Sequence, residues 1–139
     1  VSLQALDLAD RVYPVLQLTL PYIRNAKRLQ DVFRALGYAE TKIRWIVNRC
    51  EKNSEITLDD LKRTLGLNAP ITLPNQYDAV STAVNQGLPV CKVSPHSAIA
   101  RALRDIAADI APEPEPVRGT WLSGLLRGGM ARTQPGLVT

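Results

Sequence analysis

The sequence predicts an α/β fold, namely part of a parallel sheet with flanking helices, followed by a separate C-terminal tail. Short runs rich in β-branched and aliphatic residues alternate with longer segments in which apolar residues recur every three or four positions, which is typical of βαβ units. Hydrophobic residues make up 45% of the 139 positions and charged residues 22%, as in globular domains. The proline-rich run 112–116 separates this part from a glycine-rich remainder.

The first predicted strand lies within residues 10–21, a stretch rich in Val, Leu and Tyr that ends at a proline. An amphipathic helix is predicted over residues 22–36, and Gly37 ends it. Its apolar positions have helical spacing and are Ile23, Ala26, Leu29, Val32, Phe33 and Leu36.

A second strand is predicted over residues 43–48, and the polar segment 51–55 is a loop. Thr57 then stands three residues before Asp60, a capping-box arrangement in which Asp replaces the usual Glu or Gln. The acidic pair Asp59-Asp60 is interpreted as structural, because acids in the first turn of a helix favour its dipole. This helix has an apolar stripe of Leu58, Leu61 and Leu65 and stops at Gly66.

A brief strand is predicted over residues 70–74, and a helix over residues 77–86 closes at Gly87. A longer helix is expected to begin at Ser94-Pro95, a cap residue followed by proline, and to reach Ile110. Its apolar face comprises Ile99, Ala102, Leu103, Ile106 and Ile110. Three strands are fewer than a parallel sheet usually has, so we expect the chain to be part of a larger α/β domain whose remainder lies upstream. We also expect an open sheet edge and exposed apolar surface.

The composition predicts three regions: residues 1–111 form the α/β part, 112–119 a Pro/Glu linker, and 120–139 a mobile tail with a short apolar segment. In the tail, one face of a short helix would carry Trp121, Leu122, Leu125 and Leu126. Two interpretations stay open. The segment docks on a partner or a membrane surface, or it packs back on its own domain.

Several classes of protein are excluded or disfavoured. No apolar run reaches the roughly 20 residues that span a bilayer, and no signal peptide is visible. Two cysteines without a CxxC pattern, Cys50 and Cys91, indicate a reducing cytosol, and no metal site is expected. His96 follows Pro95 and is interpreted as part of the opening turn of a helix. The net charge of +4 is too modest to indicate nucleic acid by itself.

The sequence also lacks a phosphate-binding loop. Neither GxxxxGK[ST] nor GxGxxG occurs, and Gly128-Gly129 has no strand before it. A segment that binds a nucleotide without such a loop supplies at most contacts to the base and the ribose.

An ordered set of segments carries a family resemblance: Leu16 to Arg24, Trp45-Ile-Val-Asn48-Arg49, Leu65-Gly66, Ile71 to Asn75, and Ala79 to Pro89. Over residues 9–111 the chain resembles the C-terminal half of the MinD/ParA family of P-loop ATPases. It is most similar to the CpaE/TadZ branch, which helps to place the Flp (Tad) pilus assembly machinery at the cell pole.

The resemblance implies ATP as cofactor, with Mg only where the upstream P-loop half is present. It implies that Asn48 faces the adenine with Arg49 beside it, and that the loop Pro74-Asn75-Gln76 lies on the other side of the base. An Asn amide suits this role because it offers both a donor and an acceptor. The alternative for Asn48 is a strand-end residue that caps the following turn.

The signature lysines, magnesium-binding hydroxyl and Walker B aspartate of the family have no match here, so this chain alone should not hydrolyse ATP. The family resemblance implies a cytoplasmic protein that dimerises around nucleotide. It would contact pilus and secretion proteins at the pole or peripherally at the inner membrane. The alternative is a non-enzymatic scaffold that docks through its tail. A third reading, a DNA-partition relative of the ParA type, rests on Arg24, Lys27, Arg28 and Arg34, which are more simply the solvated side of a helix.

Overall fold

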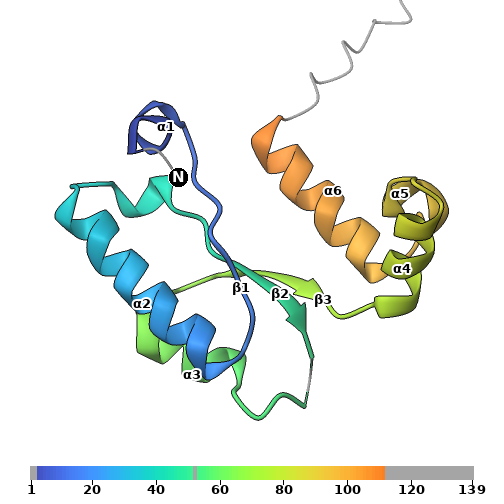
Figure 1. The fold of residues 1–139 in the computed structure, drawn as a ribbon, viewed down its shortest axis with the longest axis horizontal. Coiled ribbons are helices and arrows are strands. Elements are labelled where there is room, and N and C mark those ends of the chain that lie inside the picture. Colours follow the sequence, from blue (N-terminus) through green and yellow to red (C-terminus); the bar gives the residue numbers. More distant parts are fainter. Residues whose placement is uncertain (1–2, 52, 112–139) are drawn as a thin grey trace, which may run out of the picture.

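The structure, a computed structural model, describes residues 3–51 and 53–111 (Figure 1). The elements follow in the order α1 (Leu3–Leu8), β1 (Val15–Leu16), α2 (Leu20–Ala35), the 3-10 turn η1 (Glu40–Lys42), β2 (Ile46–Cys50), α3 (Leu58–Leu65), β3 (Ile71–Pro74), α4 (Tyr77–Asn85), α5 (Val90–Val93) and α6 (Ala98–Ile110).

The strands form a parallel sheet in the order β1-β2-β3, which confirms the predicted α/β class. Strand β1 is shorter than the strand predicted within residues 10–21, although a parallel bridge between Val12 and Ile43 extends its pairing. Leu20 already begins α2, with Pro21 in its first turn, where the missing N–H of proline costs nothing. The prediction of a strand was therefore wrong for the end of this stretch, where Leu20 and Pro21 are helical.

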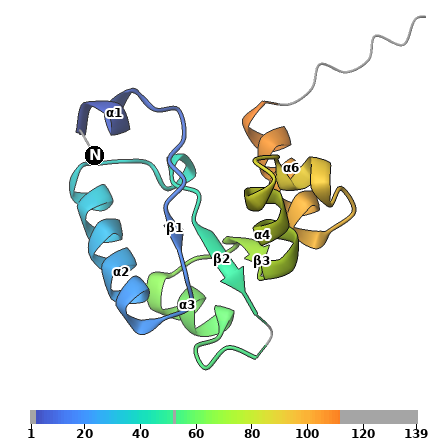
Figure 2. The ribbon, with the colours of Figure 1, turned by 45° about the vertical axis from the view of Figure 1, so that its right-hand side comes forward.

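Helices cover both faces of the sheet, with α2 and α3 on one face and α4, α5 and α6 on the other (Figures 1 and 2). Because neighbouring residues of a strand point to opposite faces, Trp45 and Val47 join the core under α2 and α3, whereas Ile46 joins the core under α6. The larger core consists of Leu16, Ile23, Ala26, Phe33, Trp45, Val47, Leu61 and Leu65.

Helix α2 buries only part of its predicted apolar face. Ile23, Ala26 and Phe33 are buried, but Leu29, Val32 and Leu36 remain 38%, 48% and 43% exposed. The edge strand β1 likewise leaves Val15 56% exposed. The open sheet edge and the exposed apolar surface that the sequence predicts are thus both present in the described part of the chain. Val80 and Val84 on α4 and Ile110 on α6 are also exposed.

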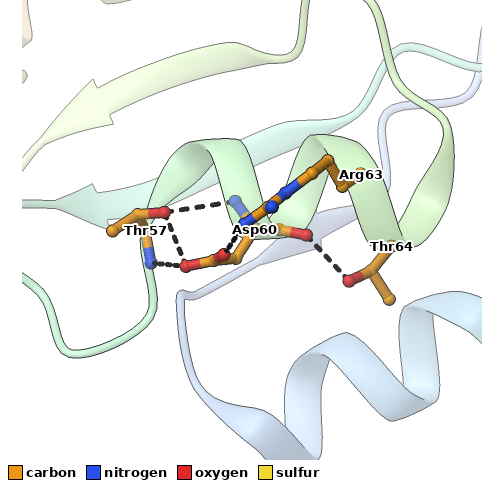
Figure 3. Close-up of polar contacts among 4 residues, drawn as sticks. All are labelled: Thr57, Asp60, Arg63 and Thr64. Carbon is orange, nitrogen blue, oxygen red and sulfur yellow. Dashed lines mark hydrogen bonds and ion pairs between the residues drawn. The ribbon is translucent and has the colours of Figure 1, made fainter.

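The capping box of α3 is confirmed (Figure 3). The backbone N–H of Asp60 donates to Thr57 Oγ1 at 3.1 Å, and the backbone N–H of Thr57 donates to Asp60 Oδ2 at 3.0 Å. The shorter Asp side chain reaches the cap as a Glu would. At the other end Gly66 has a φ of 64°, the left-handed conformation that glycine adopts without strain.

The start of the last helix differs from the prediction. Helix α6 begins at Ala98, and its N-cap is Ser97, whose Oγ accepts from the backbone N–H of Ala100 at 3.2 Å. Ser94 instead ends the short helix α5, and Ser97 donates to its carbonyl oxygen. His96 is exposed in the turn between α5 and α6. The Ser-Pro pair therefore belongs to a turn between two helices.

Long-range polar contacts fix the N-terminal segment and α6. Tyr38 donates a hydrogen bond of 2.5 Å to Asp7 of α1, a helix that the sequence did not predict. At the end of α6, Arg11 lies 2.6 Å from Asp109, and Tyr13 donates to the same carboxylate at 3.1 Å. The hydrogen bond from Arg11, and after it the one from Tyr13, lower the pKa of Asp109.

Candidate functional site

The candidate site lies where β2 and β3 end. Parallel strands finish at the same edge of a sheet, and Cys50, the last residue of β2, pairs with Pro74, the last residue of β3. In open α/β sheets this carboxyl edge is where ligands bind. The four predicted cofactor-binding residues, Asn48, Arg49, Pro74 and Asn75, are brought together there.

A bulge in β2 shapes this edge. Between the pairs Val47–Thr72 and Cys50–Pro74, strand β2 advances by one residue more than β3. Arg49 takes up the extra length with a φ of 52°, and of the described residues it alone is a non-glycine in the left-handed region. A bulge of this kind re-aims side chains and ends strand pairing. Sequence patterns do not report such a bulge.

Asn48 supports the bulge. Its Oδ1 accepts a hydrogen bond of 2.9 Å from the backbone N–H of Arg49. Its amide nitrogen makes no hydrogen bond to the described residues, and the side chain is half-buried. The alternative that Asn48 caps the following turn therefore accounts for its side-chain oxygen. Its amide nitrogen has no acceptor among the described residues.

The loop after β3 is tied to both sides of the edge. The backbone N–H of Asn75 donates to the carbonyl oxygen of Cys50 at 3.2 Å, and its side-chain amide donates to Glu51. Gln76 accepts a 2.7 Å hydrogen bond from the backbone N–H of Ile99, in the first turn of α6. Sequence analysis assigned Glu51 only to a polar loop, because its partner is 24 residues away.

A cavity of about 360 Å³ adjoins this edge, between the end of β2 and the start of α3. Its described lining consists of Cys50, Glu51, Ser54, Thr57, Leu58 and Asp59. Both carboxylates of this lining already have partners, since Glu51 accepts from Asn75 and Asp59 pairs with Lys62, and their charge would repel phosphate.

Asp60 is engaged in the cap and is not available to a ligand. Hydrogen bonds from the side chain and backbone of Thr57, followed by that from Arg63, lower the pKa of this carboxyl (Figure 3). Asp59 pairs with Lys62 at 3.2 Å. The structural interpretation of this acidic pair is confirmed by these contacts.

The remaining candidate groups are dispersed. Cys91 donates to the carbonyl oxygen of Ala100 at 3.6 Å, and Cys50 is half-buried beside the bulge. Among residues 3–51 and 53–111, no group of three or more His, Cys, Asp and Glu side chains could hold a metal ion. Within the same ranges, no helix is long and apolar enough to cross a membrane.

The predicted linker 112–119 and the predicted contact residues of the tail, Trp121, Leu122, Leu125 and Leu126, lie outside the described residues. The basic residues of α2, in contrast, are described. Arg24, Lys27, Arg28 and Arg34 are all exposed, and Lys27 pairs with Asp31 at 3.4 Å.

A parallel sheet with helices on both faces defines the chain as an α/β protein with a doubly covered sheet. Comparisons with known proteins narrow this class. The sequence is 30% identical over 120 residues to the septum site-determining protein MinD of Thermotoga maritima, covering 83% of this chain and 44% of that protein. No protein-family model matches.

Solved structures agree with this relationship. A ParA family ATPase from Chlorobium tepidum has a TM-score of 0.67 and 26% identity, over 76% of this chain and 43% of that one. The MinC:MinD cell division complex of Aquifex aeolicus has a TM-score of 0.62 and 20% identity, over 81% of this chain and 47% of that one. MinD of Pyrococcus horikoshii complexed with Mg-ADP has a TM-score of 0.57 and 15% identity, over 72% of this chain and 41% of that one.

The chain is therefore related to the MinD/ParA P-loop ATPases and has the fold of part of them. It spans less than half the length of these relatives.

Proposed function

We propose that this chain supplies the base-side half of the nucleotide site in a MinD/ParA-like ATPase, with ATP as the nucleotide. The observation that carries this proposal is the convergence of Asn48 and Arg49 with Pro74 and Asn75 at the carboxyl edge of the sheet. The free amide donors of Asn48 suit a ring nitrogen of adenine, and the Pro74–Asn75 loop would cover the base from the other side.

The phosphates and Mg belong to other parts of such a protein. Mg-ADP is bound in the MinD structure from P. horikoshii, which supports a magnesium nucleotide in the parent protein. This sequence has no phosphate loop, and the described cavity beside Cys50 carries carboxylates. Hydrolysis therefore requires the P-loop half, and this chain contributes binding and orientation of the base.

At a finer level, we propose the CpaE/TadZ branch, in which an ATP-dependent dimer positions pilus and secretion proteins at the cell pole. This assignment rests on the order of the sequence segments from Leu16 to Pro89. The relative in the MinC:MinD complex supports the general idea that a partner protein binds such an ATPase. The intact mass and the N-terminal sequence of the native protein would first test the proposal that the chain is part of an ATPase. A product that extends upstream through a Walker A loop supports the ATPase proposal.

The site is tested in that native protein by nucleotide binding. We expect Asn48→Ala to weaken ATP affinity by about fivefold to tenfold, the effect of one lost hydrogen bond. Affinity for a nucleotide with a different base, such as UTP, should change less. Asn25→Ala, an exposed position on α2, is the matched control. Equal losses for ATP and UTP would contradict a base contact.

The alternative function, a scaffold that docks through Trp121 to Leu126, makes a different prediction. Removal of residues 112–139 should abolish association with partner proteins or with vesicles, while nucleotide binding stays unchanged. For the DNA-partition reading, binding to duplex DNA would have to fall steeply with added salt.

A further inference from the structure

One pair of polar side chains ties together the two loops at the carboxyl edge of the sheet. Glu51 follows directly after β2, Asn75 follows directly after β3, and the side-chain amide of Asn75 donates to Glu51 Oε1. The backbone N–H of Asn75 also donates to the carbonyl oxygen of Cys50 at 3.2 Å. Asn75 is therefore held at this edge both through its backbone and through its side chain.

The carboxylate of Glu51 fixes which end of the Asn75 amide stays free. An ionised carboxylate can only accept hydrogen bonds, so Nδ2 of Asn75 and not its Oδ1 must face Glu51. The side chain of Asn75 is exposed, and its Oδ1 accepts no hydrogen bond from the described residues. The amide therefore offers a ligand its oxygen, as an acceptor, together with the second hydrogen of Nδ2.

This orientation matches adenine and conflicts with a 6-oxo purine. An Asn amide pairs with adenine when its oxygen accepts from the 6-amino group and its nitrogen donates to N7. Hypoxanthine and guanine carry an oxygen at position 6, which would face the oxygen of Asn75 with no hydrogen between the two acceptors. If the amide turned over, this conflict would disappear, but the oxygen of Asn75 would then face the carboxylate of Glu51.

We propose that Asn75 selects adenine at this edge through its side-chain oxygen, and that Glu51 is a positioning residue that prevents the Asn75 amide from turning over. This inference rests on the function proposed above and adds to it the residue that chooses the base. A purely structural role of Glu51, namely to join the two loops, would affect all nucleotides equally.

Binding of ATP and ITP to the native protein tests the proposal, because ITP differs from ATP only in its base and carries the 6-oxo group. We expect the wild type to bind ATP about tenfold more tightly than ITP. Glu51→Gln keeps the length of the side chain, and its amide can either accept from Asn75 or donate to it, so the loops stay joined in both orientations. This variant should reduce the preference for ATP to about twofold, mainly because ITP binds more tightly.

Two further variants separate the orientation of Asn75 from the charge of Glu51. Glu55→Gln removes the same charge from an exposed position in the loop after β2, and it should keep the wild-type preference. Asn75→Ala should lower ATP affinity about fivefold to tenfold without weakening ITP binding. In the protein without nucleotide, we expect NMR to show a shift of the Asn75 side-chain amide resonances in Glu51→Gln and none in Glu55→Gln.

Three results would overturn the proposal. These are an unchanged preference for ATP in Glu51→Gln, an equal loss of affinity for both nucleotides in that variant, and unshifted side-chain resonances of Asn75. The function proposed above survives each of them if Asn48→Ala still weakens ATP binding. If the native protein binds neither nucleotide, both proposals fail.

Discussion

The backbone N–H of Asn75 donates a 3.2 Å hydrogen bond to the carbonyl oxygen of Cys50, and this contact joins the loop after β3 to the end of β2. It closes the edge at which Asn48 and Pro74 also lie. Asparagine and proline are both common in turns. Only the position of Asn48 and Pro74 at the ends of two neighbouring parallel strands makes them a candidate ligand site.

The strained backbone at Arg49 predicts an unusual effect of glycine. Since Arg49 has a φ of 52°, Arg49→Gly should raise the free energy of unfolding by about 0.5–1 kcal/mol. Arg49→Val should lower it by about 1–2 kcal/mol, because β-branched residues fit this region poorly. Urea denaturation measures both. Arg24→Gly, at an exposed position in the second turn of α2, is the control and should be destabilising by about 1 kcal/mol. A loss of stability in Arg49→Gly would contradict the left-handed conformation.

The capping box of α3 predicts a pH-dependent contribution to stability. The folded pKa of Asp60 lies below its ordinary value of 3.8, so its stabilising effect is fully present above that value and is lost as the pH falls through the folded pKa. Asp60→Asn should lower the Tm at neutral pH, and the difference from wild type should vanish at pH values below the folded pKa. Thermal unfolding monitored by circular dichroism at several pH values tests this expectation. Thr57→Ala, which removes the other half of the cap, should cost about 1 kcal/mol. A difference that persists unchanged at the lowest pH would argue against the cap.

Burial predicts which leucines matter for folding. Leu61 is fully buried between α3 and the sheet, so Leu61→Ala should lower the free energy of unfolding by about 2–5 kcal/mol. Leu29→Ala on α2 should cost less than about 1 kcal/mol, since Leu29 is 38% exposed in the structure. Denaturant titrations of the chain compare the two variants. A large effect at Leu29 would mean that its face of α2 is covered, for example by a second copy of the chain, and the effect should then depend on protein concentration.

The hydrogen bond between Gln76 and Ile99 connects the candidate site to α6. Gln76→Ala should destabilise the protein by about 1 kcal/mol and should speed hydrogen exchange of the Ile99 amide, because that amide loses its acceptor. Gln86→Ala, exposed at the end of α4, is the control and should leave this exchange rate unchanged. Unaltered exchange at Ile99 in the Gln76 variant would show that water replaces the side chain fully.

The sequence by itself determined the α/β class, the number of strands, and the presence of the helices that the structure has at Leu20–Ala35, Leu58–Leu65 and Tyr77–Asn85. These features depend on local patterns: apolar spacing, the cap formed by Thr57 and Asp60, and the stop at Gly66. The same local rules misplaced the start of α6, because Ser94-Pro95 and Ser97 are both acceptable caps and the choice between them depends on the turn after α5.

Only the tertiary structure decided which apolar positions are buried and how the site residues meet. Leu29 and Phe33 satisfy the same helical spacing, yet Phe33 is buried and Leu29 is not, because burial depends on what packs against each side of α2. The bulge at Arg49 and the contact of Asn75 with Glu51 likewise come from pairing across the fold. Residue order predicts local conformation, whereas contacts between distant segments depend on the register of the strands and the packing of the helices on them.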